Sequence, residues 1–283
     1  MTIRAARPGD AEPCGRICYE AFHAINTIHA FPPDFPSPEA AIRTISGIFS
    51  HPGFWCVVAE HDGRIAGSNC LDERSSVYGV GPITVDPAAQ NRGAGRLLME
   101  AVLDRARQRR AASVRLLQAA FHNRSLSLYT KLGFDAREPV SVMQGPALKR
   151  AIEGCAVRPA QTADLDAANA VCEQVHGHAR AGELEDAIGR GTAVIVERHG
   201  RITGYASVLA FFGHAVAESN LDLKALICSA ESFGGAGILV PTRNSELFRW
   251  CLAQGLKVVQ PLTLMTIGLY NEPRGAYLPS ILY

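Results

Sequence analysis

Sequence patterns that mark several classes of protein are missing from this chain. Its 8 cysteines form no Cys-x-x-Cys pair and no Cys/His cluster with zinc spacing, so nothing supports a metal site. Scattered cysteines in a long chain are typical of buried free thiols rather than of a disulfide framework. No apolar run approaches the ~20 residues that a membrane span requires, and the start, MTIRAARPGDAEP, has no apolar signal core. We expect a soluble, cytoplasmic protein with no metal and no membrane partner.

An excess of one charge is also missing. The 28 basic residues balance the 27 acidic residues, for a net charge of +1. A nucleic-acid-binding protein normally carries a basic excess, so we do not expect nucleic acid as a partner. Hydrophobic residues make up 47% of the 283 residues, which is enough for a sizeable core. The length fits two domains at the usual ~150 residues each.

The chain repeats itself. The segment VVAEHDGRIAG (57–67) matches VIVERHGRITG, which starts at Val194. Both segments look like β-hairpins, with apolar alternation on either side of a polar turn that contains glycine. The openings IRAARPGDAE at Ile3 and VRPAQTADLD at Val157 are also similar. In each opening a short strand leads to Asp10 or Asp164 as the N-cap of an Ala-rich helix.

Two matching features in the same order indicate that a whole domain was duplicated. Gly145, Pro146 and Gly154 break regular structure between the copies. We therefore predict one domain over residues 1–147 and a second over 154–283. Within the first, strands near 2–6, 54–60, 64–71, 77–85, 113–119 and 134–143 alternate with helices near 10–29, 38–49, 94–110 and 123–131. This order predicts an α/β fold, in which each domain is a twisted mixed sheet flanked by helices.

A glycine-containing turn, QNRGAG (90–95), stands between a predicted strand and a predicted helix. The first N–H groups of a helix lack partners, and the helix dipole makes this end partly positive. Glycines there let an anion such as phosphate approach the backbone. A P-loop is excluded because Leu98 stands where its second glycine would be, with no Lys-Ser/Thr behind it. A dinucleotide fingerprint is excluded because its last glycine is missing.

QNRGAG is similar to the Q/R-x-x-G-x-G/A signature of the GCN5-related N-acetyltransferase superfamily. Val85, Asp86 and Pro87 precede it, as in many members. NRSLSLYTKLGF (123–134) resembles the family's second motif, in which an Asn, a Tyr and a Gly-Phe pair follow in this order. The resemblance covers most of residues 1–145, and two motifs in order are much stronger evidence than a lone glycine turn.

The resemblance implies acetyl-coenzyme A, or another acyl-coenzyme A, as co-substrate. Its pyrophosphate would lie on the turn and its pantetheine arm along the preceding strand, opened by a bulge near Gly81-Pro82. The implied coenzyme-binding residues are Ile83, Thr84, Val85, Gln90, Asn91, Arg92, Gly93, Ala94, Gly95, Arg96 and Asn123. Tyr129 would lie near the thioester sulfur. For Tyr129 a core position with a paired hydroxyl is the structural alternative, and for Asn123 it is a helix N-cap.

Acyl transfer to an amine needs a proton acceptor and a proton donor. An alkyl ammonium with a pKa near 10.4 is neutral in only about one molecule in a thousand at pH 7.4, a cost of ~4 kcal/mol. A carboxylate, a water chain or desolvation of the amine must deal with that proton. Tyr129 is the candidate acid. Asp72 and Glu73 are the candidate bases, at the end of a strand next to the coenzyme strand, although either is equally compatible with a solvated hairpin.

The second half departs from the family pattern. At the expected turn it reads AESNLDLKA, with no G-x-G, and Cys251 stands where the first half has Tyr129. The arrangement resembles a tandem subgroup of the superfamily with a degenerate C-terminal copy, which we expect to shape the acceptor pocket. We predict an N-acetyltransferase that acts on the amine of a small molecule. The alternative is a non-catalytic protein that binds or senses acyl-coenzyme A.

Overall fold

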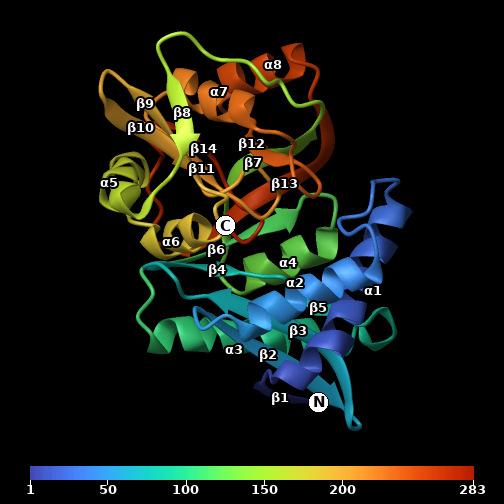
Figure 1. Cartoon of the computed structure of the whole chain (residues 1–283). Coiled ribbons are helices and arrows are strands. Elements are labelled where there is room, and N and C mark those ends of the chain that lie inside the picture. Colours follow the sequence, from blue (N-terminus) through green and yellow to red (C-terminus); the bar gives the residue numbers. More distant parts are fainter.

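The computed structural model describes residues 1–283, and its two halves lie one above the other (Figure 1). The first half contains β1 (Thr2–Ala5), α1 (Ala11–Ile28), α2 (Pro38–Ser50), β2 (Phe54–His61), β3 (Arg64–Asp72), β4 (Val77–Val80), β5 (Thr84–Val85), α3 (Ala94–Gln108), β6 (Ser113–Ala119), α4 (Asn123–Lys131) and β7 (Asp135–Gln144). The second half contains β8 (Ala156–Pro159), α5 (Leu165–His176), α6 (Ala181–Gly189), β9 (Val194–Arg198), β10 (Arg201–Ala206), β11 (Ala215–Ala217), α7 (Asn220–Ser229), β12 (Ile238–Pro241), α8 (Ser245–Ala253), β13 (Lys257–Gly268) and β14 (Ala276–Leu278).

The mixed α/β fold is confirmed, and each predicted element of the first half is present. One predicted strand is divided. The segment 77–85 forms β4 and β5, with a cis peptide bond at Gly81-Pro82 between them. The segment 145–155, where we expected the boundary between the copies, contains no helix or strand.

The internal repeat extends to a network of charged side chains. Arg4 binds Asp10 (Nη1 to Oδ2, 2.6 Å) and Glu60 (Nη2 to Oε1, 2.6 Å). In the second half, Arg158 binds Asp164 (2.7 Å) and Glu197 (2.7 Å) through the same atoms. The same polar cluster therefore joins the first strand, the first helix and the hairpin in both halves.

Asp10 and Asp164 stand at the N-cap positions of α1 and α5, but neither side chain accepts a hydrogen bond from its helix. The Asp10 carboxylate accepts from Arg4 and from the backbone N–H of Arg7 (2.7 Å). The predicted N-cap positions are confirmed, but the two carboxylates bind the guanidinium groups of Arg4 and Arg158 and the backbone before the helix, instead of the first N–H groups of the helix.

The two halves exchange strands. A nine-stranded sheet runs in the order β1-β2-β3-β4-β6-β13-β7-β12, with β5 paired to β3, and a five-stranded sheet runs β14-β11-β10-β9-β8. Strand β13 of the second half therefore lies between β6 and β7 of the first, antiparallel to both (Figure 1). Each half completes part of the sheet of the other.

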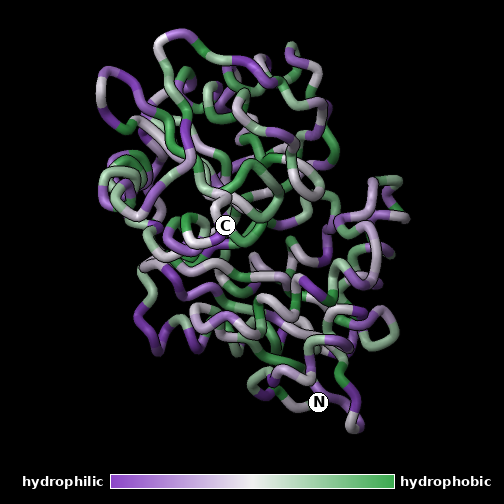
Figure 2. The backbone as a smooth tube through the Cα atoms, viewed as in Figure 1, coloured by the Kyte–Doolittle hydropathy of each residue, from purple (hydrophilic) through white to green (hydrophobic).

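Helices cover both faces of the first sheet. On one face, Leu98 and Met99 of α3 pack against Val57 and Ala59 of β2. On the other, α1 and α2 pack against Val58, because successive strand residues point to opposite faces. Figure 2 shows the hydrophobic segments along the inner strands and hydrophilic segments on the outer turns. All eight cysteines are free and seven are buried, as expected. No helix is long and apolar enough to cross a membrane.

Candidate active site

A slot opens in the sheet where two strands diverge. Strand β4 pairs with β3 and, in parallel, with β6 from Val77 opposite Ser113 to Gly79 opposite Arg115. After the Gly81-Pro82 bond, β5 pairs only with β3. The later residues of β6, 116–119, pair with β13 on their other edge and with no strand on this one. The predicted opening near Gly81-Pro82 is therefore present.

The glycine turn lies beside this slot. Gly93 is the N-cap of α3 and has a φ of 86°, in the left-handed region that glycine adopts without strain. Leu97 is the first residue of the helix whose backbone N–H has an acceptor. It donates to the Gly93 carbonyl (3.1 Å). The N–H groups of residues 91–96 donate to no acceptor in the chain. This row of free donors at a helix N-terminus fits an anionic group such as a pyrophosphate.

The glycine at position 95 is explained better by a ligand close to the backbone than by the packing of the chain. A Cβ atom placed there would lie 3.7 Å from Leu128 Cδ2 and from Val85 Cγ2, which is ordinary van der Waals contact. Its φ lies outside the left-handed region that favours glycine. Nothing in the chain itself therefore requires a glycine at this position, whereas a ligand close to the backbone would.

Arg124, which the sequence analysis did not single out, ties helix α4 to the turn. Its Nη2 donates to Asn91 Oδ1 (2.5 Å) and its Nη1 to Gln90 Oε1 (3.4 Å), and Gln90 Nε2 donates to the Val85 carbonyl (3.3 Å). Arg96 is exposed and pairs with Glu100 (2.8 Å), and Arg92 is exposed. Three guanidinium groups thus belong to the turn or contact it.

Tyr129 and Asn123 both line the cavity that the slot belongs to. The Tyr129 ring is 8% exposed and packs 6.0 Å from the Phe134 ring, within the core under α3. Its hydroxyl makes no hydrogen bond in the chain, and burial raises its pKa. Asn123 is the exposed first residue of α4, while His122 occupies the N-cap position. The structural alternatives, a paired core hydroxyl and an N-cap asparagine, are both absent.

Asp72 and Glu73 lie outside the residues that line the cavity. The Asp72 carboxylate pairs with Arg74 (2.5 Å), and Glu73 pairs with Arg105 of α3 (2.7 Å). Both carboxylates are therefore held in ion pairs, and the structure does not bring them together with Tyr129.

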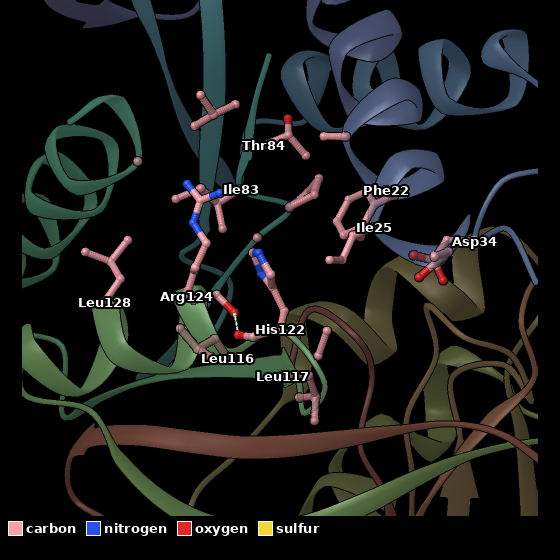
Figure 3. A pocket seen from close by; sticks show the side chains of 18 of the residues that line it. Phe22, Ile25, Asp34, Ile83, Thr84, Leu116, Leu117, His122, Arg124 and Leu128 are labelled. Atoms are coloured by element: carbon pink, nitrogen blue, oxygen red, sulfur yellow. Dashed lines mark hydrogen bonds between the residues drawn. The ribbon is translucent and has the colours of Figure 1, made fainter. Parts of the chain in front are cut away.

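The slot opens into a cavity of about 870 Å³ (Figure 3). One end is lined by the turn, β5 and α4, and the other by α1, the loop that follows it, and the second half. The second half contributes Phe211, Phe212, Gln260, Leu262, Ile281 and Leu282. Most of the lining is apolar, and Asp34 is its only carboxylate. The second half thus contributes to the wall of the cavity.

The second half has no counterpart of the glycine turn. The N–H of Asp86 donates to the Ala66 carbonyl, and that of Glu218 donates to the Thr203 carbonyl, which fixes the equivalence of the two copies. Residues 86–93 separate β5 from α3, whereas only Glu218 and Ser219 separate β11 from α7.

The N-terminus of α7 is already occupied by the chain's own groups. The fully buried Asp222 accepts from Ser219 Oγ (2.5 Å), Thr203 Oγ1 (2.8 Å) and Arg198 Nε (2.8 Å). Burial raises the pKa of this carboxyl, but these hydrogen bonds outweigh it and the net pKa is lowered. A carboxylate at this point would repel a phosphate.

Comparisons with known proteins agree with this geometry. Residues 20–134 match the sequence model of the acetyltransferase (GNAT) family. A mycothiol acetyltransferase of Nocardia farcinica is 44% identical over 63 residues, and the matched segment spans only 22% of this chain and 21% of that protein.

Two solved structures are similar over almost the whole chain. A putative acetyltransferase from Pyrococcus horikoshii has a TM-score of 0.75 at 20% identity, with 97% of this chain and 93% of that one covered. A tandem GNAT protein from the clavulanic acid biosynthesis pathway has a TM-score of 0.55 at 13% identity, with 95% and 99% covered. At these identities the likeness establishes the fold, a tandem arrangement of two GNAT-like units.

Proposed function

We propose that the chain transfers an acetyl group from acetyl-coenzyme A to the amine of a small molecule, because residues 20–134 match the acetyltransferase (GNAT) family. The observation that carries this proposal is the row of free N–H groups at residues 91–96, beside a slot in the sheet that opens into a cavity. Acetyl-coenzyme A bound there would supply the activated acyl group.

The residues at the slot suit the two parts of such a co-substrate. The free amides from Arg92 to Arg96, with the guanidinium groups of Arg92, Arg96 and Arg124 nearby, suit its phosphates. Ile83 and the edge of β5 that follows it have no strand partner on the slot side, and this edge suits an extended amide-bearing chain. Thr84 and Asn123 line the same space, and the buried Thr84 hydroxyl has no hydrogen-bond partner.

Tyr129 is the group of this chain best suited to donate a hydrogen bond or a proton to the departing sulfur. Burial raises its pKa, so the hydroxyl is protonated at neutral pH. The same shift makes it a weaker acid than a free tyrosine. We therefore assign it chiefly to hydrogen bonding of the thiolate as negative charge develops there, with full proton transfer completed from solvent.

The alternative of a non-catalytic coenzyme-binding protein is weaker, because the same cavity that holds the slot and the turn also reaches Asp34, Phe212 and Gln260, on both halves of the chain. A coenzyme-binding protein needs no such extension, whereas an acceptor substrate does. The relative from Nocardia farcinica is named as an enzyme, which agrees with this choice.

Release of free thiol from acetyl-coenzyme A in the presence of mixed small amines tests the proposal. We expect release that depends on both substrates and is lost in Gly95→Val. Tight coenzyme binding without release on any amine would favour the sensing function. Absence of coenzyme binding by calorimetry would refute both functions.

A further inference from the structure

The cavity holds one carboxylate, and the fold fixes it in place. Asp34 lies in the loop between α1 and α2, next to Phe35, which is 7% exposed and packs against Phe22 and Phe212. Asn26 of α1, 2% exposed, holds the same loop through a hydrogen bond from its Nδ2 to the Pro32 carbonyl (3.2 Å). Figure 3 shows Asp34 beside Phe22 and Ile25, across the view from Leu128 and Arg124.

Gln260 of the second half completes this end of the cavity. Its Nε2 donates to Asp34 Oδ1 (3.0 Å), while its Oε1 has no partner although the side chain is only 3% exposed. The pairing of β13 with β7 shifts register between Val258 and Gln260. A bulge of this kind re-aims the side chains on a strand, and here it accompanies an amide that reaches from one half of the chain to a carboxylate in the other.

The two side chains leave acceptor atoms without a cationic or hydrogen-bonding partner at this end of the cavity. Asp34 forms no ion pair with any Lys, Arg or His of the chain. Its burial raises the pKa of the carboxyl, and the hydrogen bond from Gln260 offsets part of that rise. The side-chain amide of Gln260 donates to Asp34. Its oxygen, Oε1, accepts no hydrogen bond from the chain. A buried amide oxygen without a donor, beside a carboxylate without a cationic partner, is costly unless a ligand supplies donors.

We propose that Asp34 and Gln260 Oε1 bind the ammonium group of the acceptor, and that the acceptor is a primary amine on an apolar body. Asp34 then accepts one proton from the bound ammonium, the neutral nitrogen forms the C–N bond as the C–S bond breaks, and the departing thiolate takes its proton from solvent. An ammonium is the matching group, because it carries three donors, one positive charge and no acceptor. The body of the substrate would lie against the apolar wall formed by Phe22, Ile25, Phe35 and Phe212. This inference rests on the proposed acetyl transfer and specifies its substrate class.

The apolar wall favours binding of amines with an apolar body over binding of polar amines. An amino sugar would place several hydroxyl groups against aromatic and aliphatic side chains that offer them no partner. An amino acid would bring its own carboxylate close to Asp34, and like charges at such a site repel each other.

Kinetics with matched amines test the proposal. The panel is 2-phenylethylamine and hexylamine as apolar amines, phenylalanine as the same body with a carboxylate, and glucosamine as a polar amine. We expect the apolar amines to exceed the other two in kcat/KM by about 100-fold. In Asp34→Asn the kcat/KM for 2-phenylethylamine should fall about 10- to 100-fold, the range expected when a hydrogen bond to a charged group is lost. Gln260→Met should cause a smaller loss, and both should retain the coenzyme affinity of the parent.

Asp62→Asn is the matched control, because that carboxylate is 88% exposed at a hairpin turn far outside the cavity lining. It should leave every rate unchanged. Preference for glucosamine, or full activity of Asp34→Asn, would overturn the ammonium site while leaving acetyl transfer intact. If no amine releases thiol, calorimetry with 2-phenylethylamine alone decides. Binding that Asp34→Asn loses would support the site, and the same weak or absent heat in both proteins would refute it.

Discussion

Replacing Gly95 by valine separates the needs of the fold from those of the coenzyme. The position accepts a Cβ atom at ordinary contact distance, 3.7 Å from Leu128 and Val85. Valine is also a better helix residue than glycine, by roughly 0.3–0.5 kcal/mol. The variant should therefore fold with a thermal midpoint close to that of the parent.

The effect on the coenzyme should be large. The side chain would occupy the space in front of the free N–H groups at residues 95 and 96, which in our proposal face the pyrophosphate. Hydrogen bonds to a charged group contribute about 1.5–3 kcal/mol each. Losing two of them weakens binding by about 3–6 kcal/mol, which is at least a 100-fold rise in Kd. Gly95→Ala should give a smaller effect in the same direction.

Titration calorimetry with acetyl-coenzyme A and thermal unfolding of the same preparations measure the two quantities. Gly47→Val is the control, because Gly47 lies within α2 and a Cβ there meets nothing within 4 Å. It should leave the coenzyme affinity unchanged. Full affinity in a folded Gly95→Val would show that the phosphates bind elsewhere, and the assignment of the turn would fall.

Three further predictions concern the same site. Tyr129→Phe should lower kcat about 100-fold, the low end for loss of one hydrogen-bond donor to the charge that develops in the transition state, with the coenzyme affinity and the thermal midpoint retained because the hydroxyl has no partner in the chain; an unchanged kcat would remove Tyr129 from the mechanism. Arg124→Met should weaken coenzyme binding about 10-fold at low salt and less at high salt, since an exposed charge is screened; equal losses at both would indicate a structural role. Calorimetry should give one coenzyme per chain, because Asp222 occupies the matching helix end of the second half; two equal sites would contradict the degenerate-copy interpretation.

The sequence predicted the elements of the fold and the glycine turn at the start of α3 because both depend on local chemistry. A glycine turn before a helix has the same consequences wherever it occurs, and alternating apolar residues identify a strand without knowledge of its neighbours. The two halves have similar sequences around Arg4, Asp10 and Glu60. The structure shows that these residues and their counterparts in the second half form the same ion-pair network.

The acceptor end could not be predicted in this way, because its residues meet only through long-range packing. Asp34 stands in a proline-rich loop that reads as a simple connection, and Gln260 lies 226 residues further along the chain. Its approach to Asp34 requires β13 to enter the other half's sheet, and no local pattern encodes that pairing. Asp72 and Glu73 were placed on the correct strand end, but alternation does not reveal that Arg74 and Arg105 hold them outside the cavity.

Strand exchange explains why a half without a coenzyme turn is still indispensable to the other. Removing residues 154–283 would take β13 from between β6 and β7 and leave both strands with unpaired edges, a hazard for aggregation. It would also remove Gln260, Phe211 and Phe212 from the cavity. The N-terminus of α7 can therefore be occupied by Asp222 without loss to the first half, whereas β13 cannot be removed without opening the first half's sheet. In our proposal the second half adds Gln260 and Phe212 to an acceptor site whose carboxylate, Asp34, comes from the first half.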